Sequence, residues 1–421
     1  MKKFLTTIIL LLTMCSSALL PIATPAQAVS ADTTQTNTTQ ATDIKAKSAI
    51  AADPKTGQIL YAKNIDEQLP IASMTKMISL AVVLDQIKAG KLNWDDQITI
   101  SDELSTLSVH PDLSNVPLVA GQSYSVRDLF DASIIASANA CIMALADKIA
   151  GNQENFVNMM KEKLKSWGIT QCHIITSTGL NNTYLTNWKY PNTSDDDENT
   201  MTAKDVAIVA MHIVNDYPEF LQVSKKATAT FAGNYEMTNW NLMLPSLPVY
   251  TEGVDGLKTG TTDKAGACFA GTANRNNFRI ITVVMNAENG QTDKTARFVQ
   301  TKNLMEYVYN NFEQQTISKN KTIDTFKTIQ VKDAKEITQP VVTQKETTIA
   351  VAKNSQPTFK EQKTTSLTAP VQKDTKAVTL EVENQLGYLT KPVTLNLVTK
   401  HSVEKANFFV RAGREIKSWF N

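Results

Sequence analysis

The order of hydrophobic patterns along the chain constrains its fold more than any other feature. Two runs with β-type alternation flank a turn at residues 53–57. A helical pattern dominates the middle of the sequence, and from Gly256 the period returns to two in three consecutive runs: GLKTG, ACFAGTAN and FRIITVVMNA. A helix-like run then ends near residue 312. Strands from both ends of this region are therefore expected in one domain with a helical middle, over residues 44–312.

The segment before that domain has the features of an export signal. Two lysines precede an apolar stretch over residues 4–22, and the small-x-small sequence Ala26-Gln27-Ala28 follows. This order predicts a signal peptide over residues 1–28, so we expect an exported protein. Residues 29–43 are polar and rich in Thr and Gln, which predicts a solvated linker.

The sequence changes character again beyond residue 320. Residues 320–398 contain short alternating runs and recurrent turn residues, which predicts a small all-β domain; a disordered polar tail is the alternative. Residues 402–420 place apolar side chains on one broad arc of a helix: Val403, Ala406, Phe408, Phe409, Val410, Ala412, Ile416, Trp419 and Phe420. Such a helix is too charged to span a bilayer and is expected to anchor the protein to a membrane surface; a helix docked on the β domain is the alternative.

Composition and spacing argue against several classes of function. The net charge is only +1 in 421 residues, which argues against nucleic acid as a partner. None of the four histidines lies in an HExxH-type pair, so neither a metal nor another cofactor is expected. The mature chain would keep Cys141, Cys172 and Cys268, too few for a disulfide framework. The acidic run at residues 194–199 predicts a solvated loop.

Ser73 and Lys76 stand at the start of a helix-like apolar run that Gly90 stops. Residues i and i+3 share one face of a helix, so the Lys76 amine can reach the Ser73 hydroxyl. A lysine that acts as a base near neutral pH needs a pKa about three units below its reference value, about 4 kcal/mol, which burial and a nearby positive charge can supply. The alternative is an ordinary helix start, with Ser73 as N-cap and Lys76 at the surface.

Two further motifs follow in order, Ser137-Ala138-Asn139 and Lys258-Thr259-Gly260. The first lies in a break between apolar helices, where a hydroxyl and an amide could pass a proton and orient a substrate. The second opens a strand, where Lys and Thr side by side can hold a carboxylate and Gly260 allows another backbone to approach closely. A second Lys-Thr-Gly, at residues 55–57, lies in a turn, and a second Ser-x-x-Lys, at residues 318–321, lies after the domain. The ordered set therefore predicts a serine-nucleophile enzyme.

With these three motifs in order, the chain resembles the penicillin-binding serine D,D-peptidases, specifically the low-molecular-mass D-alanyl-D-alanine carboxypeptidases. The resemblance extends to DGLKTGTTDKAG, to STGL at residues 177–180, to the β domain and to the amphipathic C-terminus. It implies a transpeptidase/β-lactamase-like α/β domain, in which helices flank a five-stranded antiparallel sheet. It also implies peptidoglycan stem peptides ending in D-Ala-D-Ala as substrates and β-lactam antibiotics as covalent inhibitors. The expected location is the extracytoplasmic face of the cytoplasmic membrane.

The resemblance implies a role for each residue of the first two motifs. Ser73 would be the acylated nucleophile, Lys76 its general base and Ser137 the proton-relay hydroxyl. Asn139 would orient the substrate. The family usually has Ser-Gly-Asn where this chain has Ser-Ala-Asn, a departure that concerns loop geometry rather than the role.

The same resemblance implies where the substrate binds. Lys258 and Thr259, with Gly260 beside them, would hold the terminal carboxylate of the peptide. The backbone N–H groups of Ser73 and Thr261 would form the oxyanion hole.

Three other functions share some of these motifs. A class A β-lactamase also needs a Glu-x-x-Leu-Asn motif for deacylation, and residues 140–257 contain none. A D,D-transpeptidase or endopeptidase of the same fold would form the same acyl-enzyme and differ in its substrate or acceptor. A wall-binding protein with a spent site is the alternative from another class. Turnover of a D-Ala-D-Ala peptide distinguishes these functions. Water as the acceptor indicates a carboxypeptidase, an amine indicates a transpeptidase, and no release of D-alanine indicates a binding protein.

Overall fold

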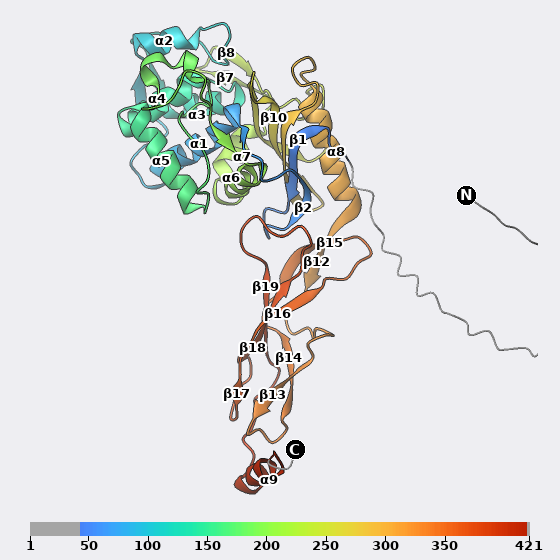
Figure 1. Cartoon of the computed structure of the whole chain (residues 1–421). Coiled ribbons are helices and arrows are strands. Elements are labelled where there is room, and N and C mark those ends of the chain that lie inside the picture. Colours follow the sequence, from blue (N-terminus) through green and yellow to red (C-terminus); the bar gives the residue numbers. More distant parts are fainter. Residues whose placement is uncertain (1–42, 419–421) are drawn as a thin grey trace, which may run out of the picture. The chain divides into compact units, whose positions relative to one another are not determined.

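The computed structural model describes residues 43–418, and a five-stranded antiparallel sheet organises the first part of them (Figure 1). The strands follow the order β2 (Ile59–Lys63), β1 (Ala46–Ala52), β11 (Phe278–Ala287), β10 (Gly266–Arg275) and β9 (Val254–Thr262). Strands far apart in sequence are neighbours, since Ile50 of β1 pairs with Val283 of β11. The sheet predicted from both ends of the domain is therefore confirmed, and β9 is one of its edges.

Helices cover both faces of this sheet (Figure 1). Ala49 and Ala51 of β1 belong to the apolar cluster that packs under α8, whereas Ile50 and Ala52 belong to the larger cluster of the other helices. The helices are α1 (Lys76–Lys88), α2 (Asp102–Ser108), α3 (Val126–Ile135), α4 (Asn139–Ala150), α5 (Gln153–Ser166), α6 (Ala203–Asp216), α7 (Pro218–Ser224) and α8 (Ala296–Asn311).

Short elements connect the helices. Three are single 3₁₀ turns: η1 (Ala72–Thr75), η2 (Asn182–Tyr184) and η3 (Thr186–Trp188). The others are strand pairs: β3 (Leu69–Pro70) with β6 (Thr200–Met201), β4 (Gln97–Thr99) with β5 (Ser123–Ser125), and β7 (Thr228–Phe231) with β8 (Tyr235–Thr238).

A second β region follows α8, which makes the alternative of a disordered tail wrong. Here β12 (Phe312–Ile317) pairs with β15 (Thr347–Ala352). The other strands form a six-stranded sheet in the order β16 (Phe359–Thr364), β18 (Lys376–Val382), β19 (Thr394–Thr399), β14 (Thr338–Thr343), β13 (Thr328–Lys332) and β17 (Leu367–Thr368). Alternate residues such as Leu380 and Val382 form its buried core.

The C-terminal helix is shorter than the sequence predicts. Helix α9 spans Phe408–Ser418, whereas Val403 forms a β-bridge with Val371 and Lys405 one with Ala334. Residues 402–406 are therefore part of the β region, because their backbone groups pair there and the Val403 side chain is buried. Within residues 43–418, no helix is long and apolar enough to cross a bilayer.

Some predictions fall outside the residues that the structure describes. These are the signal peptide over residues 1–28, all but the last residue of the linker over residues 29–43, and the apolar side chains of Trp419 and Phe420.

Candidate active site

Lys76 is completely buried and surrounded by neutral polar groups. Its Nζ lies 2.9 Å from the Ser73 Oγ, 2.7 Å from the Asn139 Oδ1 and 3.0 Å from the Thr178 carbonyl oxygen. Burial, and secondarily the positive charge of Lys258, hold the pKa of Lys76 well below its usual value. A neutral amine has two N–H donors and one lone pair. It can therefore donate to Asn139 and Thr178 and still accept the Ser73 hydroxyl proton.

The alternative of an ordinary helix start at Ser73 is wrong. The helix begins with the 3₁₀ turn η1, the Ser73 hydroxyl makes no capping hydrogen bond, and Lys76 has no contact with solvent. Ala72, just before the serine, has a left-handed φ of 47°. Gly179 packs against this turn so closely that a Cβ there would lie 1.9 Å from the Ala72 carbonyl oxygen. Only glycine fits at that position, and it brings the Thr178 carbonyl to Lys76.

Ser137 lies in the break between α3 and α4, and Asn139 is the first residue of α4, but only Asn139 forms a hydrogen bond with Lys76. The Asn139 amide nitrogen donates to the Ser114 carbonyl oxygen at 2.9 Å, which directs its amide oxygen at the lysine. Ser137 is buried and has a left-handed φ of 56°. Its hydroxyl forms no hydrogen bond with any residue between 43 and 418.

Lys258 is a second buried lysine, and it lies on the edge strand β9. Its side chain is 2% exposed, and its Nζ donates to the Thr259 carbonyl oxygen at 3.3 Å. It forms no ion pair with a carboxylate of the described part of the chain. Burial, and secondarily the charge of Arg297, lower the pKa of Lys258 to about 7. A buried ammonium without an anion is unfavourable, so this side chain is suited to an anionic ligand.

Gly260 allows β9, which carries Lys258, to pack closely against η1, the turn that leads into the helix of Lys76. A Cβ at Gly260 would lie 2.7 Å from the Ile71 carbonyl oxygen and 3.2 Å from the Ala72 Cβ. Any larger residue would push β9 away from η1. The edge of β9, where Thr259 and Thr261 lie, is therefore held directly against the turn that carries Ser73.

The comparisons with known proteins agree on one family. The family model described as D-alanyl-D-alanine carboxypeptidase, peptidase S11, matches residues 34–289. The chain belongs to this family. It is accordingly a serine-type carboxypeptidase, a hydrolase of the penicillin-binding protein group.

Individual relatives support the same assignment. DacA of Haemophilus influenzae is 32% identical over 319 residues, 76% of this chain and 72% of that protein. DacF of Bacillus subtilis is 26% identical over 89% of this chain and 90% of its own length. Both carry the name D-alanyl-D-alanine carboxypeptidase.

Solved structures of penicillin-binding proteins share the fold. PBP3 of Streptococcus pneumoniae, a peptidoglycan synthesis regulatory factor, matches with a TM-score of 0.72 and 36% identity over 86% of this chain and 100% of its own. Penicillin-binding protein D2 of Listeria monocytogenes, solved with ampicillin bound, matches with a TM-score of 0.53 and 29% identity over 63% of this chain and 98% of its own.

Arg297 contacts the strand that carries Lys258, and the sequence motifs did not reveal it. From α8, its guanidinium donates to the Gly260 carbonyl oxygen at 2.7 Å and to the Thr261 Oγ1 at 2.7 Å. It also donates to the Cys268 carbonyl oxygen on β10. This buried cation holds the end of β9 in place and adds positive charge beside Lys258. A lone arginine in a helix-like run gives no sequence signal.

The acidic run of the carboxypeptidase is only partly a solvated loop. Asp195 and Asp196 are exposed, as predicted, but Glu198 and Asn199 are buried. Asn199 donates to the Thr75 Oγ1 at 2.9 Å and accepts from the Ile175 N–H at 2.7 Å, and Glu198 accepts from the Thr262 hydroxyl at 2.6 Å. The prediction was wrong for these two because their partners are distant in sequence. They hold η1, the segment before Thr178 and the end of β9 together.

Proposed function

We propose that this enzyme removes the terminal D-alanine from peptidoglycan stem peptides through an acyl-enzyme on Ser73. The neutral Lys76 amine takes the Ser73 hydroxyl proton as Oγ attacks the carbonyl carbon of the penultimate D-alanine. The new C–O bond forms a tetrahedral intermediate whose oxyanion would accept hydrogen bonds from the Ser73 and Thr261 N–H groups.

Collapse of this intermediate breaks the peptide C–N bond. The departing D-alanine nitrogen takes up the proton held by Lys76, and the free Ser137 hydroxyl is suited to relay it. Water then attacks the ester, again with Lys76 as base, and releases the shortened peptide and Ser73. Asn139, fixed by Ser114, would hold the amide of the acyl part throughout.

The observation that carries this proposal is the pair of buried lysines, neither of which has a carboxylate partner among residues 43–418. Lys76 has neutral partners and a depressed pKa, as a base requires. Among the described residues, Lys258 bonds only to the Thr259 carbonyl oxygen, and the charge of Arg297 adds to the positive potential around it. Its amine is therefore available to a bound anion, as recognition of a terminal carboxylate requires.

The test is the release of D-alanine from a short peptide that ends in D-Ala-D-Ala. We expect free D-alanine and the shortened acid from the native enzyme, and neither from Ser73→Ala. Added amine separates the transpeptidase reading, because a transpeptidase would give an amide product instead of the acid. No release by correctly folded protein would favour a binding protein with a spent site.

We also propose that β-lactams acylate Ser73. Supporting this is the relative from Listeria monocytogenes, whose structure holds ampicillin. A β-lactam amide carries a carboxylate near its reactive carbonyl, so the same Lys258 and Ser73 would receive it.

Finally, we propose that the enzyme is exported through the signal peptide over residues 1–28. We further propose that its domains span residues 44–312 and 320–398, and that it is attached peripherally to the membrane. The support for attachment is the orientation of α9. Arg414 donates to the carbonyl oxygens of Ala334 and Lys335, so its polar side contacts the β region. The opposite side leaves Phe408 69% and Phe409 83% exposed. An amphipathic helix held in this way would present its aromatic side to the extracytoplasmic face of the membrane.

A further inference from the structure

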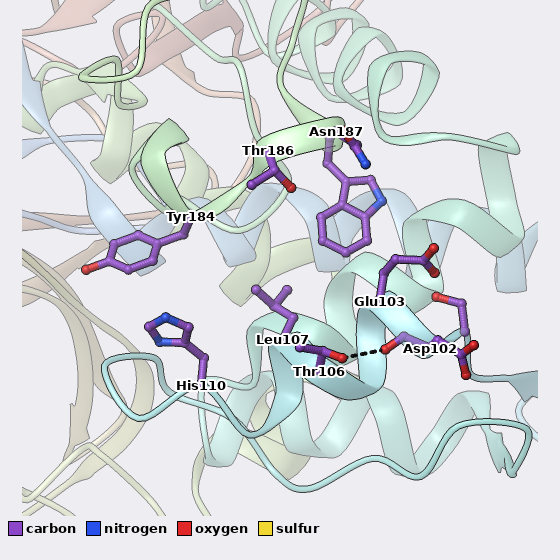
Figure 2. Close-up of a pocket in the computed structure, with 10 residues that line it drawn as sticks. Asp102, Glu103, Thr106, Leu107, His110, Tyr184, Thr186 and Asn187 are labelled. Atoms are coloured by element: carbon purple, nitrogen blue, oxygen red, sulfur yellow. Dashed lines mark hydrogen bonds between the residues drawn. The ribbon is translucent and has the colours of Figure 1, made fainter.

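A separate cavity of about 620 Å³ lies between α2 and the 3₁₀ turns η2 and η3. Its lining includes two carboxylates and several apolar or aromatic side chains: Asp102, Glu103, Leu107, His110, Tyr184 and Trp188. Figure 2 shows Asp102 and Glu103 on one side of this cavity and His110 with Tyr184 at the other. The His110 and Tyr184 rings meet edge to face, with centroids 5.5 Å apart.

One wall of the cavity is tied to the residues that hold Lys76. The Asn115 side chain donates to the Leu107 carbonyl oxygen of α2 at 2.9 Å and accepts from the Ala140 N–H at 2.8 Å. Ala140 directly follows Asn139, whose own side chain is fixed by Ser114. The loop from α2 to Asn115, which carries His110, therefore runs from the cavity to the catalytic centre.

The other wall of the cavity also begins at a residue that contacts Lys76. The chain passes from Thr178, whose carbonyl contacts Lys76, through Gly179 and Leu180 to Tyr184. Both walls thus begin at Asn139 and Thr178, which hydrogen-bond Lys76, whereas the Lys258 amine bonds to neither of them.

The lining of the cavity is negatively charged. It contains no lysine or arginine, and neither Asp102 nor Glu103 forms an ion pair with a cation of the described residues. Hydrogen bonds from its own backbone N–H and from Ser101 hold the pKa of Glu103 below its usual value, so it is ionised at neutral pH. Aromatic rings at one side of the cavity and carboxylates at the other suit an amine on an aliphatic stem. The lining offers an anionic ligand no lysine or arginine.

We propose that this cavity binds an amine-bearing side chain on the acyl half of the substrate. The inference rests on the proposed function, which puts the terminal carboxylate at Lys258 and the reacting carbonyl at Ser73. The residues before the cleaved bond must then leave the centre by a path other than the one that leads to Lys258, and both cavity walls offer such a path because they begin at Asn139 and Thr178. The aliphatic stem packs against Leu107 and the aromatic rings, and the ammonium group reaches the carboxylates.

The test compares two peptides that end in lysyl-D-Ala-D-Ala, one with a free lysine ε-amine and one with that amine acetylated. Native enzyme should favour the free amine in kcat/KM by about fivefold, mostly through KM, as expected for a partly exposed ion pair. In the double variant Asp102→Asn, Glu103→Gln this ratio should fall to about one.

Glu154→Gln is the matched control. Glu154 occupies the first turn of α5, as Asp102 and Glu103 do in α2, and it is exposed as they are, but it does not line the cavity. It tests the loss of a helix-terminal charge alone, and it should keep the native ratio.

The outcomes separate the inference from the function on which it rests. If the enzyme releases D-alanine from both peptides with equal efficiency, or if the double variant keeps the native ratio, the inference is wrong and the proposed function stands. If neither peptide is hydrolysed by native enzyme, the proposed function fails and the inference with it. A preference for a glycan-bearing peptide with acetylated amine, lost in the double variant, would make the cavity a sugar site and overturn the inference.

Discussion

The centre around Lys76 and the helix α9 depart from the usual hydrophobic pattern in opposite directions. At the centre an ionisable side chain is completely buried, whereas on α9 the Phe409 side chain is 83% exposed. Folding alone favours neither arrangement. The difference lies in what completes each region. Lys76 has its three hydrogen-bonding partners within the chain, whereas the aromatic side of α9 has no cover within the described residues.

This contrast has consequences for mutation. A buried amine with three fixed partners cannot be changed without altering the chemistry that depends on its proton. Exposed aromatic residues contribute little to the fold, so their removal should spare catalysis and affect only what they contact outside the chain.

The largest effect is expected from Lys76→Arg. Arginine keeps the positive charge but does not lose a proton near neutral pH, so acylation should slow by about 10³-fold, the usual contribution of a general base. The measurement is the rate of β-lactam acylation, with circular dichroism to show that the fold is intact. Lys88→Arg, at the exposed end of the same helix, is the control. Rapid acylation of Lys76→Arg would mean that the base lies elsewhere.

Lys258→Ala should have the next largest effect, and a selective one. A charge-assisted contact with the terminal carboxylate contributes about 1.5–3 kcal/mol, so kcat/KM should fall about 10- to 150-fold for a D-Ala-D-Ala acid. The C-terminal amide of the same peptide should lose much less. Lys264→Ala, an exposed lysine just beyond β9, should leave both substrates unchanged. Equal losses for acid and amide would contradict the carboxylate role.

The pH dependence sharpens the distinction between the two lysines. The pKa of Lys258 is lowered to about 7, so in the free enzyme it is a cation below that pH and neutral above it. Preference for the acid over the amide, as a ratio of kcat/KM values, should therefore fall as the pH rises above about 7. The ratio removes the titration of Lys76, which affects both substrates. A preference that does not change between pH 6 and 9 would show that Lys258 is not the group that binds the carboxylate.

The smallest effect on activity is expected at α9. Removal of residues 408–421, which leaves Val403 and its β-bridge intact, should release the enzyme from membranes while hydrolysis of a soluble peptide stays within about twofold. Phe408→Ser with Phe409→Ser should also release it, whereas Leu386→Ser, an exposed apolar residue elsewhere, should not. Sedimentation with vesicles is the measurement. Continued sedimentation of the truncated enzyme would show that α9 is not the anchor.

The sequence predicted the parts of the site that depend on local pattern. Ser73 and Lys76 are one helical turn apart, Ser137 and Asn139 lie at one break between helices, and Lys258 lies on a strand. These are relations within a few residues, and the fold places them as expected, except that Lys258 lies in the middle of β9 rather than at its start. The five-stranded sheet could be predicted because its strands alternate at both ends of one domain.

The residues that join these motifs could not be predicted from local pattern. Asn199 contacts Thr75 across 124 residues of sequence, and Arg297 contacts Gly260 across 37. Neither side chain belongs to a motif, and both lie in segments typical of a surface loop or an ordinary helix. Their function depends entirely on which distant backbone groups the fold brings to them. The start of the C-terminal helix was predicted at residue 402 rather than at Phe408 for the same reason, because Val403 and Lys405 pair with residues of the β region.

The central claim is that Ser73 is the nucleophile which Lys76 activates. The most direct measurement is mass spectrometry of the folded enzyme after incubation with penicillin, followed by digestion and mapping of the adduct. We expect one penicilloyl ester, on the peptide that contains Ser73, and no adduct with Ser73→Ala or Lys76→Arg under the same conditions. An ester on Ser137, or no adduct on freshly folded native protein, would contradict it.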